Sequence, residues 1–126
     1  MTDTPTGELT LRTLAMPRDV NTNGDIFGGW VLSQMDMAAG IVAAARAQGR
    51  VATVAIDAMQ FIRPVKVGDV LCIYVQIVRV GRTSMGLQIE AWVLRNRQDH
   101  REKVTEGLFT FVAIDEAGKP RVLPAA

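Results

Sequence analysis

Cysteine and histidine are almost absent from this chain, which has one cysteine, Cys72, and one histidine, His100, among its 126 residues. One cysteine cannot close a disulfide within the chain, and one cysteine with one histidine cannot supply the four ligands of a structural zinc site. We therefore expect no disulfide, no metal and a reducing compartment, the cytoplasm.

The chain also lacks an excess of charge, since its formal net charge is +1 and 21% of its residues are charged. A balanced charge produces no strong field toward nucleic acid or a membrane surface. The N-terminal segment MTDTPTGEL has no apolar stretch of the kind found in a signal peptide. We expect a protein that binds neither nucleic acid nor a membrane.

One long apolar run extends from Ile26 to Ala45, about the length of a membrane-spanning helix. Gln34 and Asp36 lie in the middle of this run, so a helix buried in a β-rich domain is the better interpretation. Hydrophobic residues make up 48% of the chain, which is enough for a substantial core. We see no repeat or linker, and therefore predict one domain spanning residues 1–126, with a core at about 8–115 and flexible ends.

The spacing of apolar residues predicts an α+β protein with one helix and five strands. Residues 28–48 have the pattern of a helix that is apolar on almost all sides and should be enclosed on most of them, with Gly49 as a stop signal. The predicted strands are 8–15, 51–62, 69–80, 83–96 and 103–114, with a charged loop at 97–102 and a turn at 115–118.

Asp36 is the one charged residue between Ile26 and Ala45. Burying an unpaired carboxylate is costly, and an acid retained in an apolar helix often has a function. Its neighbours on the helix are mostly small, which leaves room for a water molecule or a substrate atom. A structural aspartate, bonded to the backbone or to an arginine, is the alternative.

Gly28 and Gly29 lie where the helix begins, after the turn residues 21–25. The first N–H groups of a helix have no partner within it and carry partial positive charge, which suits the oxyanion that forms when a carbonyl is attacked. The alternative is that the two glycines only allow close packing of helix and sheet.

Three segments, TLAMPRDVNTNGDIFGGWVLSQMD, TVAIDAMQFIRPVKVGD and VGRTS, resemble the YciA-type acyl-CoA thioesterases, and the similarity covers residues 8–115. The resemblance implies a hotdog fold, in which a five-stranded antiparallel sheet wraps round one long central helix. It also implies hydrolysis of acyl-CoA to a carboxylic acid and CoA at a dimer interface. Coenzyme A is then part of the substrate, and we predict no cofactor.

The resemblance also implies roles for individual residues. The catalytic carboxylate corresponds to Asp36, and the backbone N–H that binds the thioester carbonyl corresponds to Gly28 or Gly29. The assisting asparagine corresponds to Asn21, with Asn23 as its competitor.

Gly28 and Asp36 lie eight residues apart, which is about 12 Å on one helix. A base and an oxyanion donor must both approach the same reacting centre, so the two groups are expected to come from different subunits. We predict a homodimer that assembles further to a tetramer or hexamer. Asp36 could activate water or attack the thioester directly, and the sequence leaves both routes open.

The phosphates of CoA need basic partners. Our first candidate is Arg82, with Thr83 and Ser84 in the same turn. Arg63 and Lys66, near the end of the adjacent strand, are further candidates, although any of these could simply be solvated. The Thr53 hydroxyl could add to the site.

A serine triad is disfavoured because no GxSxG motif is present. A hydratase is disfavoured because His100 lies in the predicted charged loop. A non-catalytic acyl-CoA sensor of the same fold remains the alternative, although it would not need Asp36.

Overall fold

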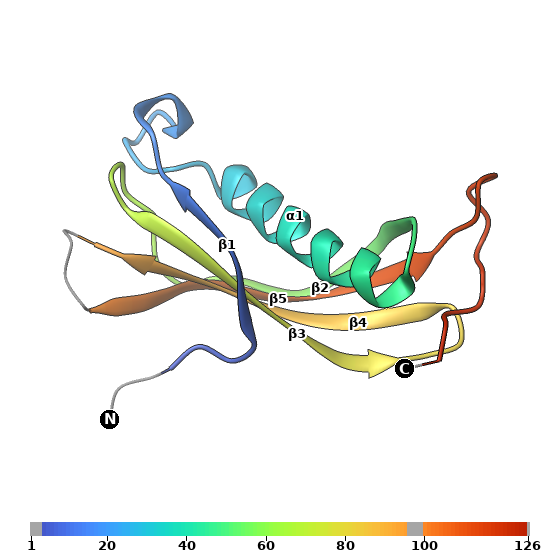
Figure 1. Ribbon diagram of the computed structural model, residues 1–126. Coiled ribbons are helices and arrows are strands. Elements are labelled where there is room, and N and C mark those ends of the chain that lie inside the picture. The colour runs from blue at the N-terminus through green and yellow to red at the C-terminus, as the bar shows by residue number, and fades with distance from the viewer. Residues whose placement is uncertain (1–3, 96–99, 126) are drawn as a thin grey trace.

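The computed structural model describes residues 4–95 and 100–125 and shows a curved antiparallel sheet with a long helix across one face (Figure 1). The predicted α+β class and the number and order of the main elements are confirmed. A short 3-10 helix, Pro17–Asp19, precedes the long helix. The main elements are β1 (Glu8–Leu14), α1 (Gly28–Ala47), β2 (Val51–Phe61), β3 (Val70–Val80), β4 (Ser84–Leu94) and β5 (Arg101–Ala113).

The strand order β1-β3-β4-β5-β2 places β1 and β2 at the two edges of the sheet. Alternate residues of β4, such as Leu87, Ile89 and Ala91, are fully buried in the main core beneath α1. β2 is irregular, because its pairing with β5 shifts between Asp57 and Gln60, and Ala58 has a positive φ of 49°. A bulge of this kind bends an edge strand and redirects the side chains that follow.

The buried face of α1 is built largely from small side chains, which let the helix lie close to the sheet. Met35, Ala38, Ala39 and Ala43 are fully buried there. The opposite face is open, since Met37 is 51% and Ile41 56% exposed. The expectation that α1 is enclosed on most sides is therefore wrong for one copy of the chain, because the sheet covers one face only.

The end of α1 differs in detail from the prediction. The helix ends at Ala47, and Gln48, not Gly49, has the left-handed conformation, with φ 53°. A side chain at position 49 would place its Cβ 2.6 Å from the Arg121 guanidinium. Arg121 in turn donates a 2.9 Å hydrogen bond to the carbonyl of Ala47. A larger residue at position 49 would therefore have to displace the Arg121 guanidinium from this position.

That segment extends the core beyond the predicted limit near residue 115. Leu123 belongs to the main core, its N–H donates to the Arg82 carbonyl at 2.9 Å, and Arg46 donates to the Pro124 carbonyl at 2.7 Å. The predicted turn at 115–118 is present, with Gly118 N–H donating to the Asp115 carbonyl.

The prediction of a charged loop at 97–102 is wrong for its last two residues, because residues 101 and 102 already belong to β5. Cross-strand pairing with β4 extends β5 over these charged residues. Residues 97–99 lie outside the described part of the chain.

Candidate active site

Asn21 shapes the loop that leads into α1. Its side-chain oxygen accepts hydrogen bonds from the backbone N–H groups of Asn23, at 2.8 Å, and Asp25, at 3.2 Å. Such a turn is typical of asparagine. Asn21 also lines a pocket at the start of the helix, whereas Asn23 is exposed and contributes its backbone N–H to the turn.

The first two N–H groups of α1, those of Gly28 and Gly29, belong to a helix end without a side-chain cap. The N-cap residue Phe27 makes no side-chain cap, and its carbonyl accepts from the N–H groups of Trp30 and Val31. Within the described residues, the N–H groups of Gly28 and Gly29 find no acceptor. The helix therefore begins with two unpaired donors and the partial positive charge of its dipole, which together can bind an oxyanion.

The two glycines differ in their surroundings. A Cβ on Gly28 would lie 3.2 Å from the ring of Phe61, whereas a Cβ on Gly29 would have no atom within 4 Å. Close packing therefore explains a glycine at position 28 but not at position 29.

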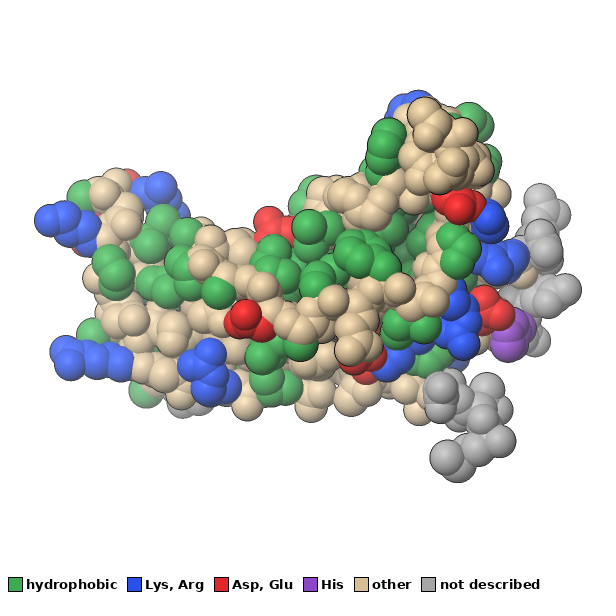
Figure 2. All heavy atoms as spheres, turned by 180° about the vertical axis from the view of Figure 1, so that it is seen from behind, with side chains coloured by type: hydrophobic (Ala, Val, Ile, Leu, Met, Phe, Trp, Pro, Cys, Tyr) green, Lys and Arg blue, Asp and Glu red, His purple; other side chains and the backbone are tan. Residues whose placement is uncertain are grey.

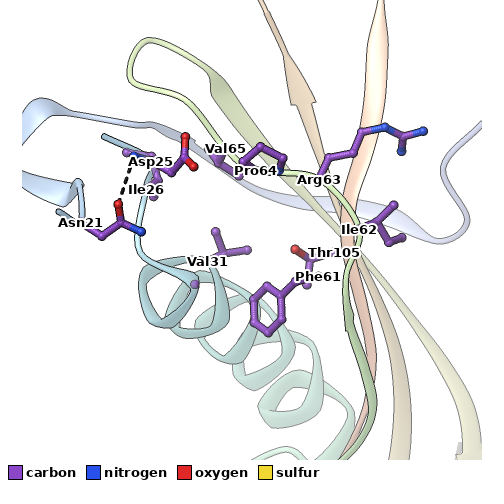
Figure 3. Close-up of a pocket in the computed structure, with 11 residues that line it drawn as sticks. Asn21, Asp25, Ile26, Val31, Phe61, Ile62, Arg63, Pro64, Val65 and Thr105 are labelled. Atoms are coloured by element: carbon purple, nitrogen blue, oxygen red, sulfur yellow. Dashed lines mark hydrogen bonds between the residues drawn. The ribbon is translucent and has the colours of Figure 1, made fainter. Parts of the chain in front are cut away.

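A pocket with a volume of about 300 Å³ opens beside the start of the helix. Figure 3 shows its walls, which come from the loop before α1, from Val31 on the first turn of the helix, and from the end of β2. Ile26, Phe61, Ile62, Pro64 and Val65 make the lining largely apolar. The polar lining residues are Asn21, Asp25, Arg63 and Thr105.

Asp36 lies two turns farther along α1 and does not line this pocket. Its Oδ1 accepts a 2.7 Å hydrogen bond from the Thr53 hydroxyl on β2. The structure thus brings two of the predicted residues, Thr53 and Asp36, into contact. It keeps both away from Gly28 and Asn21 within one copy of the chain.

Two basic residues stand at the pocket. Arg63 lines it and donates a 2.8 Å hydrogen bond to the Lys103 carbonyl. Lys66 forms an ion pair with Asp25, another lining residue. Among the described residues Arg63 makes no ion pair, so its positive charge is available at this end of the molecule for an anionic group.

Arg82, Thr83 and Ser84 lie at the opposite end of α1 from the pocket. Their carbonyls accept from the N–H groups of Leu123, Ala113 and Gly81, respectively. The Arg82 side chain is exposed. The structure therefore does not bring this turn to the pocket of the same chain.

Asp69 and Arg95 form an ion pair that was not predicted from the sequence. Asp69 is 2% exposed and accepts hydrogen bonds from Arg95 at 2.9 and 3.0 Å and from the Lys66 N–H at 2.8 Å. The hydrogen bonds that Arg95 donates to Asp69 raise the pKa of the Arg95 guanidinium above its usual value. The pair holds the loop that contains Val65 and Lys66. The backbone carbonyl of Val65 accepts a 3.0 Å hydrogen bond from the Ile26 N–H. The pair therefore supports one wall of the pocket.

Thr105 is a pocket residue that was likewise not predicted from the sequence. The available signal was a polar residue in β5 between Val104 and Phe109, both of which are fully buried.

Residues 4–95 and 100–125 hold neither a cluster of metal ligands nor a membrane-spanning helix. They contain no group of three or more His, Cys, Asp or Glu side chains placed to hold a metal ion. Nor is any helix in these ranges both long and apolar enough to cross a membrane.

Comparison with known proteins identifies the family. The model of the thioesterase superfamily matches residues 23–100. The acyl-CoA thioester hydrolase YciA of Salmonella typhimurium is 54% identical over 127 residues, which cover 98% of this chain and 96% of that protein. A hexameric thioesterase from Yersinia pestis superposes with a TM-score of 0.92 at 54% identity, covering 98% of this chain and 100% of that one.

A more distant structural match is the acyl-CoA hydrolase of Staphylococcus aureus, solved in complex with butyryl-CoA and CoA. Its TM-score is 0.84 at 28% identity, covering 91% of this chain and 70% of that one. Variants of that enzyme with one asparagine or one aspartate replaced by alanine have also been solved. The chain described here therefore belongs to the thioesterase superfamily, among the acyl-CoA thioester hydrolases named YciA, and has the hotdog fold.

Proposed function

We propose that this protein hydrolyses the thioester of acyl-CoA to a carboxylic acid and free CoA, in the cytoplasm and without a cofactor. Asp36 is the general base or the nucleophile, and the free N–H groups at the start of α1 bind the oxyanion. The observation that carries this proposal is the pair of unpaired N–H groups, at Gly28 and Gly29, beside a largely apolar pocket.

The exposed apolar surface supports a dimer in which β2 pairs with β2 of a second copy. β2 is an edge strand, and an unpaired edge readily adds another strand. Val54 and Ile56 on β2 are 57% and 39% exposed, and Met37 and Ile41 on the open face of α1 are exposed as well. Figure 2 shows hydrophobic side chains gathered in a band along the middle of one face, with basic side chains toward both ends.

Antiparallel pairing of two β2 strands would complete the site. Within one chain, Thr53 contacts Asp36 near the beginning of β2, and Phe61 lies against Gly28 at its end. Asp57 lies midway between Thr53 and Phe61. A two-fold axis near Asp57 therefore sets Thr53 of one copy opposite Phe61 of the other. Asp36 of one subunit then lies beside Gly28 and Asn21 of its partner.

The chemistry follows one of two routes. In the first, Asp36 takes a proton from water while the water oxygen attacks the thioester carbonyl carbon. The carbonyl oxygen becomes an oxyanion held by the helix N–H groups, and the C–S bond then breaks and releases the thiolate of CoA. In the second, an oxygen of Asp36 attacks the carbonyl carbon, the thiolate leaves, and water hydrolyses the mixed anhydride.

The related structures support these assignments. The asparagine and the aspartate replaced in the Staphylococcus aureus variants are separated by the same number of residues as Asn21 and Asp36 here. The Yersinia pestis relative is hexameric. We therefore propose a hexamer of three dimers for this chain, in which Arg82, Thr83 and Ser84 of a neighbouring subunit can reach a CoA phosphate, with Arg63 as a second candidate.

Thiol release from acyl-CoAs of increasing chain length tests the function. We expect wild type to release thiol, and Asp36→Asn to lower kcat by at least about a thousandfold because the essential base or nucleophile is lost. Glu116→Gln, the same kind of change at an exposed turn residue, is the matched control and should retain activity. Binding of CoA without any thiol release by wild type would instead indicate the sensor function.

A further inference from the structure

The side chain of Thr105 carries a hydrogen-bonding hydroxyl in an almost fully buried position. Thr105 is 1% exposed. No residue in the described part of the chain makes a hydrogen bond with its hydroxyl. Every fully buried side-chain nitrogen and oxygen in that part does have a partner, so the unpaired Thr105 oxygen is not fully buried. The Thr105 hydroxyl is therefore open to a space, and Thr105 lines the pocket beside α1.

The surroundings of this hydroxyl are apolar. Figure 3 shows its oxygen turned toward the interior of the pocket, on the side of Val31 and beside the ring of Phe61. Val31 and Val65 are 2% and 3% exposed. A hydroxyl left unpaired in such surroundings loses the hydrogen bonds that it makes in water. A hydrogen bond to a polar atom that enters the pocket therefore lowers the free energy of the complex.

Thr105 is also close to the proposed oxyanion donors. It pairs directly with Phe61 across β2 and β5, and the Phe61 ring packs against Gly28. The pocket therefore connects the start of α1 with Thr105. A substrate chain whose carbonyl oxygen is held by the Gly28 N–H would extend past Thr105 as it follows the pocket.

We propose that Thr105 is a substrate-binding residue whose hydroxyl bonds a polar atom of the chain in this pocket, a few bonds from the thioester. This inference rests on the proposed function. Two parts of an acyl-CoA can supply such an atom: an amide of the pantetheine arm on the sulfur side, or an oxygen substituent on the acyl side. A hydroxyl in an apolar pocket selects strongly for a partner that it can pair with.

The test compares Thr105→Val, which keeps the shape and removes the hydroxyl, with Thr105→Ser, which keeps the hydroxyl. Thr110→Val is the matched control, because Thr110 lies on the same strand, pairs with Gly86 and is not a pocket residue. KM and kcat are measured for butyryl-CoA and 3-hydroxybutyryl-CoA.

We expect Thr105→Val to lower kcat/KM by about three- to tenfold, mainly through KM, with Thr105→Ser and Thr110→Val close to wild type. If kcat/KM falls equally for both substrates in Thr105→Val, the partner of the hydroxyl is the pantetheine amide. If kcat/KM falls only for 3-hydroxybutyryl-CoA, the partner is the hydroxyl substituent of the acyl chain. Unchanged or improved kinetics with both substrates overturn the inference, because the hydroxyl is then satisfied by water.

Failure of the proposed function is distinguished from failure of this inference by a binding measurement. If wild type releases no thiol, the affinity of wild type and Thr105→Val for the two acyl-CoAs is measured by calorimetry, and equal affinities for both overturn the inference. If Thr105→Val does not fold, as judged by circular dichroism, Thr105→Ala replaces it in the same comparison.

Discussion

The Thr53 hydroxyl donates a 2.7 Å hydrogen bond to Oδ1 of Asp36, which ties the edge strand β2 to the middle of α1. The bond holds one carboxylate oxygen, so the other can face a water molecule or a substrate.

We predict that Thr53→Val lowers kcat by about 10- to 100-fold and leaves KM nearly unchanged, because a hydrogen bond to a charged group contributes about 1.5–3 kcal/mol. Thr53→Ser keeps the hydroxyl and should retain most of the activity. Steady-state kinetics of both variants provide the measurement, and equal kcat values for Thr53→Val and wild type would contradict the prediction.

Replacing Gly28 by proline should remove one N–H without breaking the helix. Proline is tolerated at the first helical position, and Phe27 before it already has the extended conformation that proline requires, with φ −55° and ψ 134°. If Gly28 is the oxyanion donor, we expect a kcat loss of about 100-fold or more. Gly28→Ala keeps the N–H, and its Cβ meets only the exposed ring of Phe61, so it should cost much less.

Mixing subunits tests whether Asp36 and Gly28 act across the dimer. Asp36→Ala and Gly28→Pro chains, each nearly inactive, are unfolded together and refolded. A mixed dimer contains one intact site if the two groups come from different chains, so activity should rise above that of either variant. No recovery, with mixed dimers shown by differently tagged chains, would place both groups of a site in one chain.

A charge on the exposed edge strand should prevent dimerisation. Val54→Lys places a positive charge in the proposed interface, and we expect monomers in light scattering together with loss of activity, because an unpaired charge cannot be buried cheaply. Val122→Lys is the matched control, since both valines are 57% exposed but Val122 belongs to the C-terminal segment and not to β2. A dimeric, active Val54→Lys variant would refute this interface.

The Arg95–Asp69 pair should contribute to stability over a wide pH range. Arg95→Gln leaves the 2% exposed Asp69 carboxylate without its main partner, so we expect a loss of about 2 kcal/mol in urea unfolding. Arg18→Gln, whose side chain is 80% exposed, should change stability by less than about 0.5 kcal/mol.

The pH dependence of this loss follows from the raised pKa of Arg95. A group whose pKa is raised by folding stabilises the protein fully at any pH below its unfolded-state pKa, and loses that effect as the pH rises through the folded-state pKa. The stability difference between wild type and Arg95→Gln should therefore stay constant between about pH 6 and pH 10. A difference that disappears within this range would show that Arg95 is not the group responsible.

Sequence alone determined the order and type of the main elements and marked Asp36 as a candidate catalytic residue. Alternation of apolar residues with polar residues or glycine over residues 84–91 marks β4, and the apolar run from Ile26 to Ala45 marks α1, because side-chain periodicity is a local property of each element. A lone carboxylate in that run is visible for the same reason.

Only the tertiary structure decided which residues meet. The Thr53–Asp36 bond joins residues 17 positions apart, and the Arg95–Asp69 bond joins residues 26 positions apart. The open hydroxyl of Thr105 depends on walls from three separate segments, and Arg82 proved distant from the pocket of its own chain. Such relationships depend on strand order, register and bulges, which arise from packing across the whole sheet and leave no periodic signal in the residues themselves.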